Sequence, residues 1–124
     1  MNYLAVFVGG GVGAFIRFII SGIDYKFYKN VFPFGTLVVN VTGGLAIGIL
    51  WAVFERFSFS PNLRLFAFTG ILGGYTTFSA FSLENFNLIR DGEYKLAILN
   101  ILLSNILAIG CVFVGYFAAK YLAR

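Results

Sequence analysis

The chain has 124 residues, of which 60% are hydrophobic and only 11% are charged; soluble domains usually have about 25% charged residues. This composition excludes an ordinary soluble domain and a disordered chain, and it indicates an integral membrane protein whose partner is the lipid bilayer. The nine basic residues give a net charge of +4. They are scattered along the chain and not clustered, so we expect no nucleic-acid partner.

Four apolar segments fill almost the whole chain, and each is long enough for a transmembrane helix of about 20 residues. We therefore predict an all-α integral membrane fold, with a single four-helix domain over residues 1–124. The expected helices cover residues 3–23, 33–54, 63–89 and 94–122. The apolar runs are about twice as long as a transmembrane strand of about 10 residues, which argues against strands.

Some residue types are missing or rare, and this limits the possible chemistry. The chain has no histidine and a single cysteine, Cys111. A Ser–His–Asp or Cys–His site therefore cannot be built, nor can an intrachain disulfide or a thiolate metal cluster. We predict that the protein is not an enzyme.

The first helix contains glycines four residues apart and a single cation, Arg17. Similar glycine pairs recur in the second and third helices, and such pairs allow close backbone approach in lipid. We interpret them as packing within one chain. Arg17 either extends to the membrane interface or hydrogen-bonds helix ends inside the protein.

The second and fourth helices carry polar residues at membrane depth. Thr36 and Asn40 are four apart and share a face, as do Asn100 and Ser104, with Asn105 beside them. Two interpretations stay open: hydrogen bonds between helices, or a polar lane that lines a water-filled path.

The third helix contains a weak helical stretch at residues 73–82, GGYTTFSAFS, and we predict a break there. Freed carbonyl groups at membrane depth need partners, which are either a hard cation or nearby Thr and Ser side chains. Phe78 and Phe81 are three apart and share a face of the resumed helix. They either pack against lipid or core, or solvate a small anion with the positive edges of their rings. Glu84 argues against an anion path unless it lies near a mouth or is protonated.

Basic residues are balanced between the two sides of the predicted bundle, so the positive-inside rule sets no orientation. One side carries four and the other carries four, or five with Arg17: Arg56, Arg64, Lys120 and Arg124 against Lys26, Lys29, Arg90 and Lys95. A chain that inserts both ways can pair with an inverted copy.

Four motifs resemble those of the Fluc (CrcB-type) fluoride channels. They are residues 9–18 (GGGVGAFIRF), 35–43 (GTLVVNVTG), 73–82 (GGYTTFSAFS) and 102–104 (LLS). The resemblance implies an antiparallel, dual-topology homodimer in the bacterial inner (plasma) membrane. It also implies that two pores export fluoride passively, and that a structural Na⁺ lies at the dimer interface.

The resemblance also implies roles for individual residues. Backbone carbonyls of Gly73 and Thr76 would hold the Na⁺, and Arg17 would be structural. The fluoride path would include Asn40, Phe78, Phe81, Ser104 and, at its border, Glu84. One departure is Asn100, at a position where several relatives have tyrosine.

The alternative is a small proton-coupled multidrug exporter of four helices. Such a protein needs a membrane-embedded carboxylate in an early helix, and here the charge of the first helix is Arg17, which has the opposite sign. An accessory subunit without transport activity is a further alternative, although a scaffold has no need of a broken helix.

Overall fold

The computed structural model describes residues 2–27 and 32–122, with side chains for 3–21 and 32–122, and these residues form an all-helical fold without strands. In chain order the elements are α1 (Asn2–Phe27), α2 (Phe34–Arg56), α3 (Pro61–Arg64), the π-helical segment η1 (Leu65–Leu72), α4 (Gly73–Tyr75), α5 (Ser79–Arg90) and α6 (Tyr94–Leu122).

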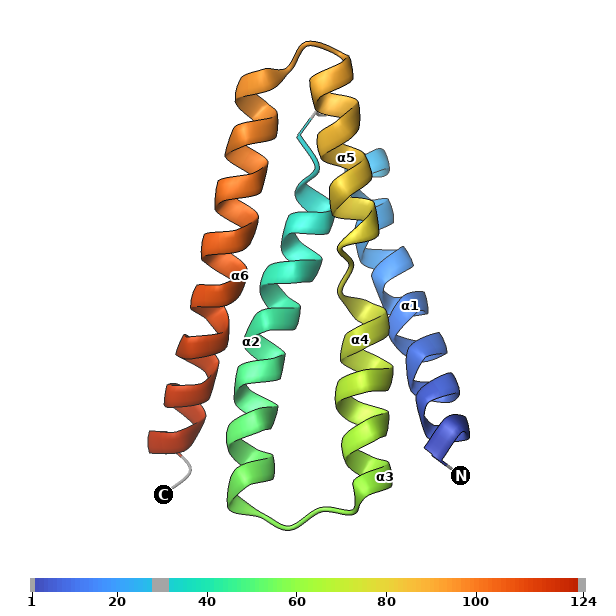
Figure 1. Cartoon of the computed structure of the whole chain (residues 1–124), viewed down its shortest axis with the longest axis vertical. Coiled ribbons are helices and arrows are strands. Elements are labelled where there is room, and N and C mark those ends of the chain that lie inside the picture. The colour runs from blue at the N-terminus through green and yellow to red at the C-terminus, as the bar shows by residue number, and fades with distance from the viewer. Residues whose placement is uncertain (1, 28–31, 123–124) are drawn as a thin grey trace.

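The helices form an elongated bundle with α2 at its centre (Figure 1). Helix α6 packs along α2, while α1 packs against η1 and α4. The start of α1, the end of α6 and the connection between α2 and α3 lie at one end of the molecule. The turn between α5 and α6 lies at the other end, and Gly92 adopts a φ of 82° there. This conformation favours glycine.

Three helices are long and apolar enough to cross a membrane: α1 over Tyr3–Ser21, α2, and α6. The protein is therefore a multi-pass membrane protein. Helix α1 continues to Phe27, so residues 24–27, which we expected in a loop, belong to its last turn. Lys29 and Arg124, which enter the charge balance, lie outside the described residues.

Glycines pack the helices closely on both sides of α2. A Cβ added at Gly13 of α1 would overlap the carbonyl oxygen of Ile71 in η1, and one at Gly48 of α2 would overlap that of Val112 in α6. A Cβ added at Gly115 of α6 would likewise overlap the backbone of α2, a contact that the glycine spacing did not predict. The glycine pairs thus bring backbones together within one chain.

The start of the third helical segment is not a regular α-helix. Ser60 caps it, because its side chain accepts a hydrogen bond of 3.2 Å from the Leu63 N–H. From Leu65 onward the helix widens into η1, and the Gly73 N–H reaches the carbonyl of Phe68, five residues back. Such π-helical turns are rare, and nothing in the residue pattern indicated this one.

Candidate functional site: the helix interruption and its adjoining pocket

The helical path is interrupted between Tyr75, the last residue of α4, and Ser79, the first residue of α5. Thr76 is extended, with φ −80° and ψ 157°. The interruption is shorter than the stretch over which we predicted it, because Gly73 and Gly74 are still helical and α5 already includes Ser79.

The Asn40 side chain on α2 pairs with the backbone of the interruption. Its Oδ1 accepts a hydrogen bond of 3.0 Å from the Thr77 N–H, and its Nδ2 donates one of 3.2 Å to the Thr77 carbonyl. The amide thus bonds both backbone groups of one residue. An amide nitrogen carries two hydrogens, so one N–H of Asn40 is left for a second acceptor.

Two backbone donors are diverted from the carbonyls that a helix would give them. In an unbroken α-helix the Thr77 N–H would bond to Gly73, but here it donates to Asn40. The Ala80 N–H would bond to Thr76, but it donates to the Thr77 Oγ1 at 3.1 Å. The carbonyls of Gly73 and Thr76 are therefore released from regular helical bonding.

Arg17 on α1 contacts the backbone just before the interruption. Its Nε donates a hydrogen bond of 3.1 Å to the carbonyl oxygen of Gly74, in α4. Of the two alternatives for Arg17, this contact matches the internal cation that bonds a helix end. Arg17 and Asn40 thus hold the interruption from two different helices.

A pocket of about 300 Å³ adjoins the interruption. It is lined by Asn40, Gly44, Ile47, Thr76, Thr77, Phe78, Phe81, Ser104, Asn105, Ala108, Ile109 and Val112. Four residues of the predicted fluoride path meet here, from three helical segments and the interruption between α4 and α5. The lining is polar near the interruption and becomes apolar along α2 and α6.

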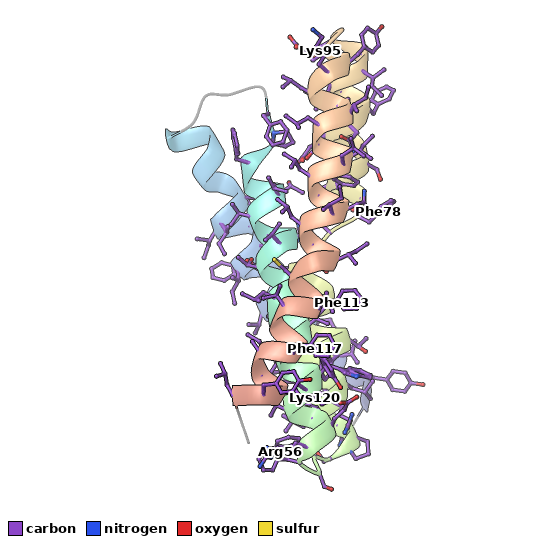
Figure 2. The ribbon with its side chains drawn as sticks, turned by 90° about the vertical axis from the view of Figure 1, so that its left-hand side faces the viewer. Arg56, Phe78, Lys95, Phe113, Phe117 and Lys120 are labelled. Carbon is purple, nitrogen blue, oxygen red and sulfur yellow. The ribbon has the colours of Figure 1, made fainter. Side chains whose placement is uncertain are left out.

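The two aromatic rings of the pocket differ in exposure. Phe81 is 7% exposed and Phe78 is 75% exposed, and their ring centroids lie 5.7 Å apart with the planes tilted by 49°. Figure 2 shows Phe78 projecting from the same side of the molecule as Phe113 and Phe117. Phe81 therefore forms a fixed wall of the pocket, and Phe78 lies at its open side.

Other predicted site residues lie outside the pocket lining. Glu84 on α5 accepts a hydrogen bond of 2.5 Å from the Thr36 hydroxyl on α2. Gly73 and Arg17 also do not line the pocket, although both lie next to the interruption. Of the residues predicted for the Na⁺ site, Thr76 alone lines it.

Ser104 continues into a buried chain of hydrogen bonds between α5 and α6. Its hydroxyl donates to the Asn100 Oδ1 at 3.1 Å, and the Asn100 Nδ2 donates to the Asn85 Oδ1 at 2.8 Å. Asn100 is 1% exposed. Asn85 was missed by sequence reasoning; its spacing of four from Phe81 was the signal that could have placed it on a buried face.

The outer surface has the charge distribution of a membrane protein. Lys95 lies at one end, and Arg56 and Lys120 at the other, while Phe113 and Phe117 lie between them (Figure 2). Charged residues at both ends and exposed aromatic side chains between them fit an apolar core of about 30 Å bounded by water on either side.

Comparisons with known proteins agree with these features. A family model described as "CrcB-like protein, Camphor Resistance (CrcB)" matches residues 4–116. The chain is 48% identical over 118 residues to a protein of Hydrogenobaculum sp. named fluoride-specific ion channel FluC, covering 94% of this chain and 96% of that protein. Proteins of the same name from Parabacteroides distasonis and Pyrococcus abyssi are 47% identical over 113 residues and 43% identical over 118 residues. They cover 91% and 94% of this chain, and 88% and 94% of their own length. The resemblance predicted from the motifs is thus confirmed, and the chain belongs to the CrcB-like family.

Proposed function

We propose that this chain is a fluoride-selective channel that lets fluoride leave the cell passively and so gives resistance to it. The observation that carries the proposal is the pocket, where the Asn40 amide, the rings of Phe78 and Phe81, and the Ser104 hydroxyl meet. The relatives named fluoride-specific ion channels, at 41–48% identity, support the choice of ion and of a channel over an enzyme.

The chemistry of the pocket suits a small, strongly hydrated anion. Such an ion crosses a membrane only if the protein replaces its water with hydrogen-bond donors and weak positive potential. The second N–H of Asn40 supplies a donor next to the interruption. The edges of Phe78 and Phe81 carry the positive end of the ring quadrupole, which attracts an anion without holding it tightly.

We propose that the working channel is an antiparallel homodimer with two pores. One chain leaves Phe78 75% exposed at the open side of the pocket, and a second copy would close it. Among the basic residues with described side chains, Arg56 and Arg64 flank the α2–α3 connection and Lys120 lies near the end of α6, at one end of the bundle, while Arg90 and Lys95 flank the α5–α6 turn at the other. This near balance allows insertion in both orientations.

A structural Na⁺ at the dimer interface fits the carbonyls of Gly73 and Thr76. Their usual helical donors are diverted to Asn40 and Thr77, and carbonyl oxygens are suitable ligands for a hard cation in interrupted membrane helices. Bound there, the ion would be coordinated by the carbonyl oxygens and link the two copies. Among the described residues, no group of three acidic or thiol side chains offers a rival metal site.

The proposed location is the bacterial inner (plasma) membrane, with the interrupted segment as a fourth crossing beside α1, α2 and α6. The proton-coupled drug exporter is not favoured. Within the apolar span of α1, Tyr3–Ser21, the charged residue is Arg17, which already donates to Gly74, and the relatives are channels by name.

The decisive experiment is fluoride release from liposomes that contain the purified protein. With a K⁺ ionophore to balance charge, wild-type vesicles should release fluoride and retain chloride. Release of neither ion, or equal release of both, would contradict the proposal.

Phe81→Ile tests the role of the ring edges. We expect fluoride release to fall by at least tenfold while the protein remains folded, because an aliphatic side chain has no positive edge. Phe86→Ile is the matched control, since Phe86 lies on the same helix, is 59% exposed and does not line the pocket. Normal conduction by Phe81→Ile would show that the aromatic edges do not contribute.

A further inference from the structure

The hydrogen-bond chain behind Ser104 has a direction, and that direction decides what Ser104 offers to the pocket. Its hydroxyl proton is donated to Asn100, so the oxygen presents lone pairs to the pocket that it lines. Lone pairs repel an anion. In this direction Ser104 cannot be the donor that a fluoride path needs.

The same three side chains can form the chain in the opposite direction. The last torsion of an asparagine has two broad minima related by a half turn, and this turn exchanges the amide oxygen and nitrogen. If both amides turn, Asn85 donates to Asn100 and Asn100 donates to Ser104. The Ser104 proton is then free to point into the pocket.

The two amides have to turn together. If one turns alone, two donors or two acceptors face each other. Asn100 is 1% exposed, and Asn85 is 8% exposed, so little water is available to relieve such a mismatch, and an unpaired buried polar group is costly. The chain therefore has two favourable states, and a ligand that interacts with only one of them shifts the balance toward it.

We propose that Asn85 is a positioning residue for the anion path: through Asn100 it sets the direction of the Ser104 hydroxyl, and fluoride in the pocket selects the reversed chain. This inference rests on the proposed function, because it assumes an anion at Ser104. It assigns a role to a residue that does not line the pocket.

Asn85→Asp tests the direction of the chain. An ionised aspartate only accepts hydrogen bonds, so it holds Asn100 as the donor and keeps the Ser104 proton turned away. We expect fluoride release at alkaline pH to fall about tenfold, the scale of one hydrogen bond. Asn85→Leu favours neither direction, and we expect its release to stay within about threefold of wild type. If leucine is as harmful as aspartate, Asn85 is merely structural and the proposal is wrong.

Two further variants separate the hydrogen-bond effect from plain charge repulsion. Asn87→Asp adds the same charge on the same helix, outside the hydrogen-bond chain that joins Asn85, Asn100 and Ser104. It should leave fluoride release nearly unchanged. In a Ser104→Ala background, Asn85→Asp should cause no further loss, because no hydroxyl remains to be directed. Equal losses from Asn85→Asp in the wild-type and Ser104→Ala backgrounds would overturn the proposal.

A measurement that does not depend on transport can be made on the wild-type protein, with one variant as its control. With asparagine labelled by ¹⁵N, sodium fluoride should shift the side-chain resonances of Asn85 and Asn100, and sodium chloride should not. Ser104→Ala should abolish the shift. If sodium fluoride shifts neither resonance in the wild type, the proposed reversal of the hydrogen-bond chain is wrong. If wild-type vesicles release no fluoride, the proposed function fails separately. The resonances still show whether fluoride reverses the hydrogen-bond chain.

Discussion

The α2–α6 pair and the interrupted segment between α3 and α5 bring the backbone close to its neighbours in different ways. In the α2–α6 pair both helices are continuous, and glycines such as Gly44, Gly48 and Gly115 let the two backbones touch. In the interrupted segment the helix opens, and side chains from other helices bond its backbone groups. The comparison shows that an interruption within the bundle depends on particular polar side chains, whereas a continuous pair depends on the absence of side chains.

The largest effect should come from Asn40→Leu, which removes both hydrogen bonds to Thr77. Two partly buried backbone groups then lose their partner, and each such group costs about 1–3 kcal/mol. We expect the free energy of unfolding in detergent to fall by about 3 kcal/mol, with loss of fluoride release. Asn105→Leu is the control for stability alone, since the Asn105 amide bonds the carbonyl of Ile101 on its own helix but the residue also lines the pocket. Equal stability of the two variants would show that the interruption does not depend on Asn40.

Gly48→Ala tests the other side of the comparison. The new methyl group would overlap the Val112 carbonyl, and two helix backbones would have to separate. We expect a destabilisation of about 2 kcal/mol, in the range of other overpacked interiors. Gly110→Ala makes the same change where a Cβ meets nothing within 4 Å, and thermal unfolding in detergent should not show a loss. A Gly48 variant as stable as the Gly110 variant would contradict the close packing of α2 on α6.

Arg17→Ala should have the smallest effect of the three on stability. It removes one charged hydrogen bond to the Gly74 carbonyl, for which we expect about 1.5 kcal/mol. Fluoride selectivity over chloride in the surviving protein should change little, because Arg17 does not line the pocket. Arg90→Ala is the control, as that side chain is 60% exposed and pairs with Asp91 at the surface, where ion pairs contribute little. A loss of selectivity without a loss of stability would place Arg17 in the anion path.

Hydropathy and local composition predicted the all-helical membrane fold. The apolar runs are long enough to identify helices without tertiary information, and the glycines and β-branched residues at 73–77 indicated where a helix is weak. The ends of the interruption were not predictable in this way. They depend on Asn40 and Arg17, which lie 37 and 57 positions away from their partners in the chain.

The candidate site was only partly predictable, for similar reasons. Phe78, Phe81, Asn40 and Ser104 were expected near one another, and the pocket brings them together. The partner of Asn100 was not expected, because a buried asparagine and a surface asparagine look alike in a sequence. The π-helical turns of η1 also left no trace, since their hydrogen bonds depend on packing and not on residue type.

The interruption between Tyr75 and Ser79 also places the C-terminus of one helical segment next to the N-terminus of another. The peptide dipoles of a helix add up to partial negative charge at its C-terminus and partial positive charge at its N-terminus. The segment that ends with α4 therefore directs negative potential at the point where the Arg17 guanidinium donates its hydrogen bond. Helix α5 begins beside Phe78 and directs positive potential toward the pocket. One opening in the chain thus favours a cation on one side and an anion on the other, without an ionised side chain in the pocket lining.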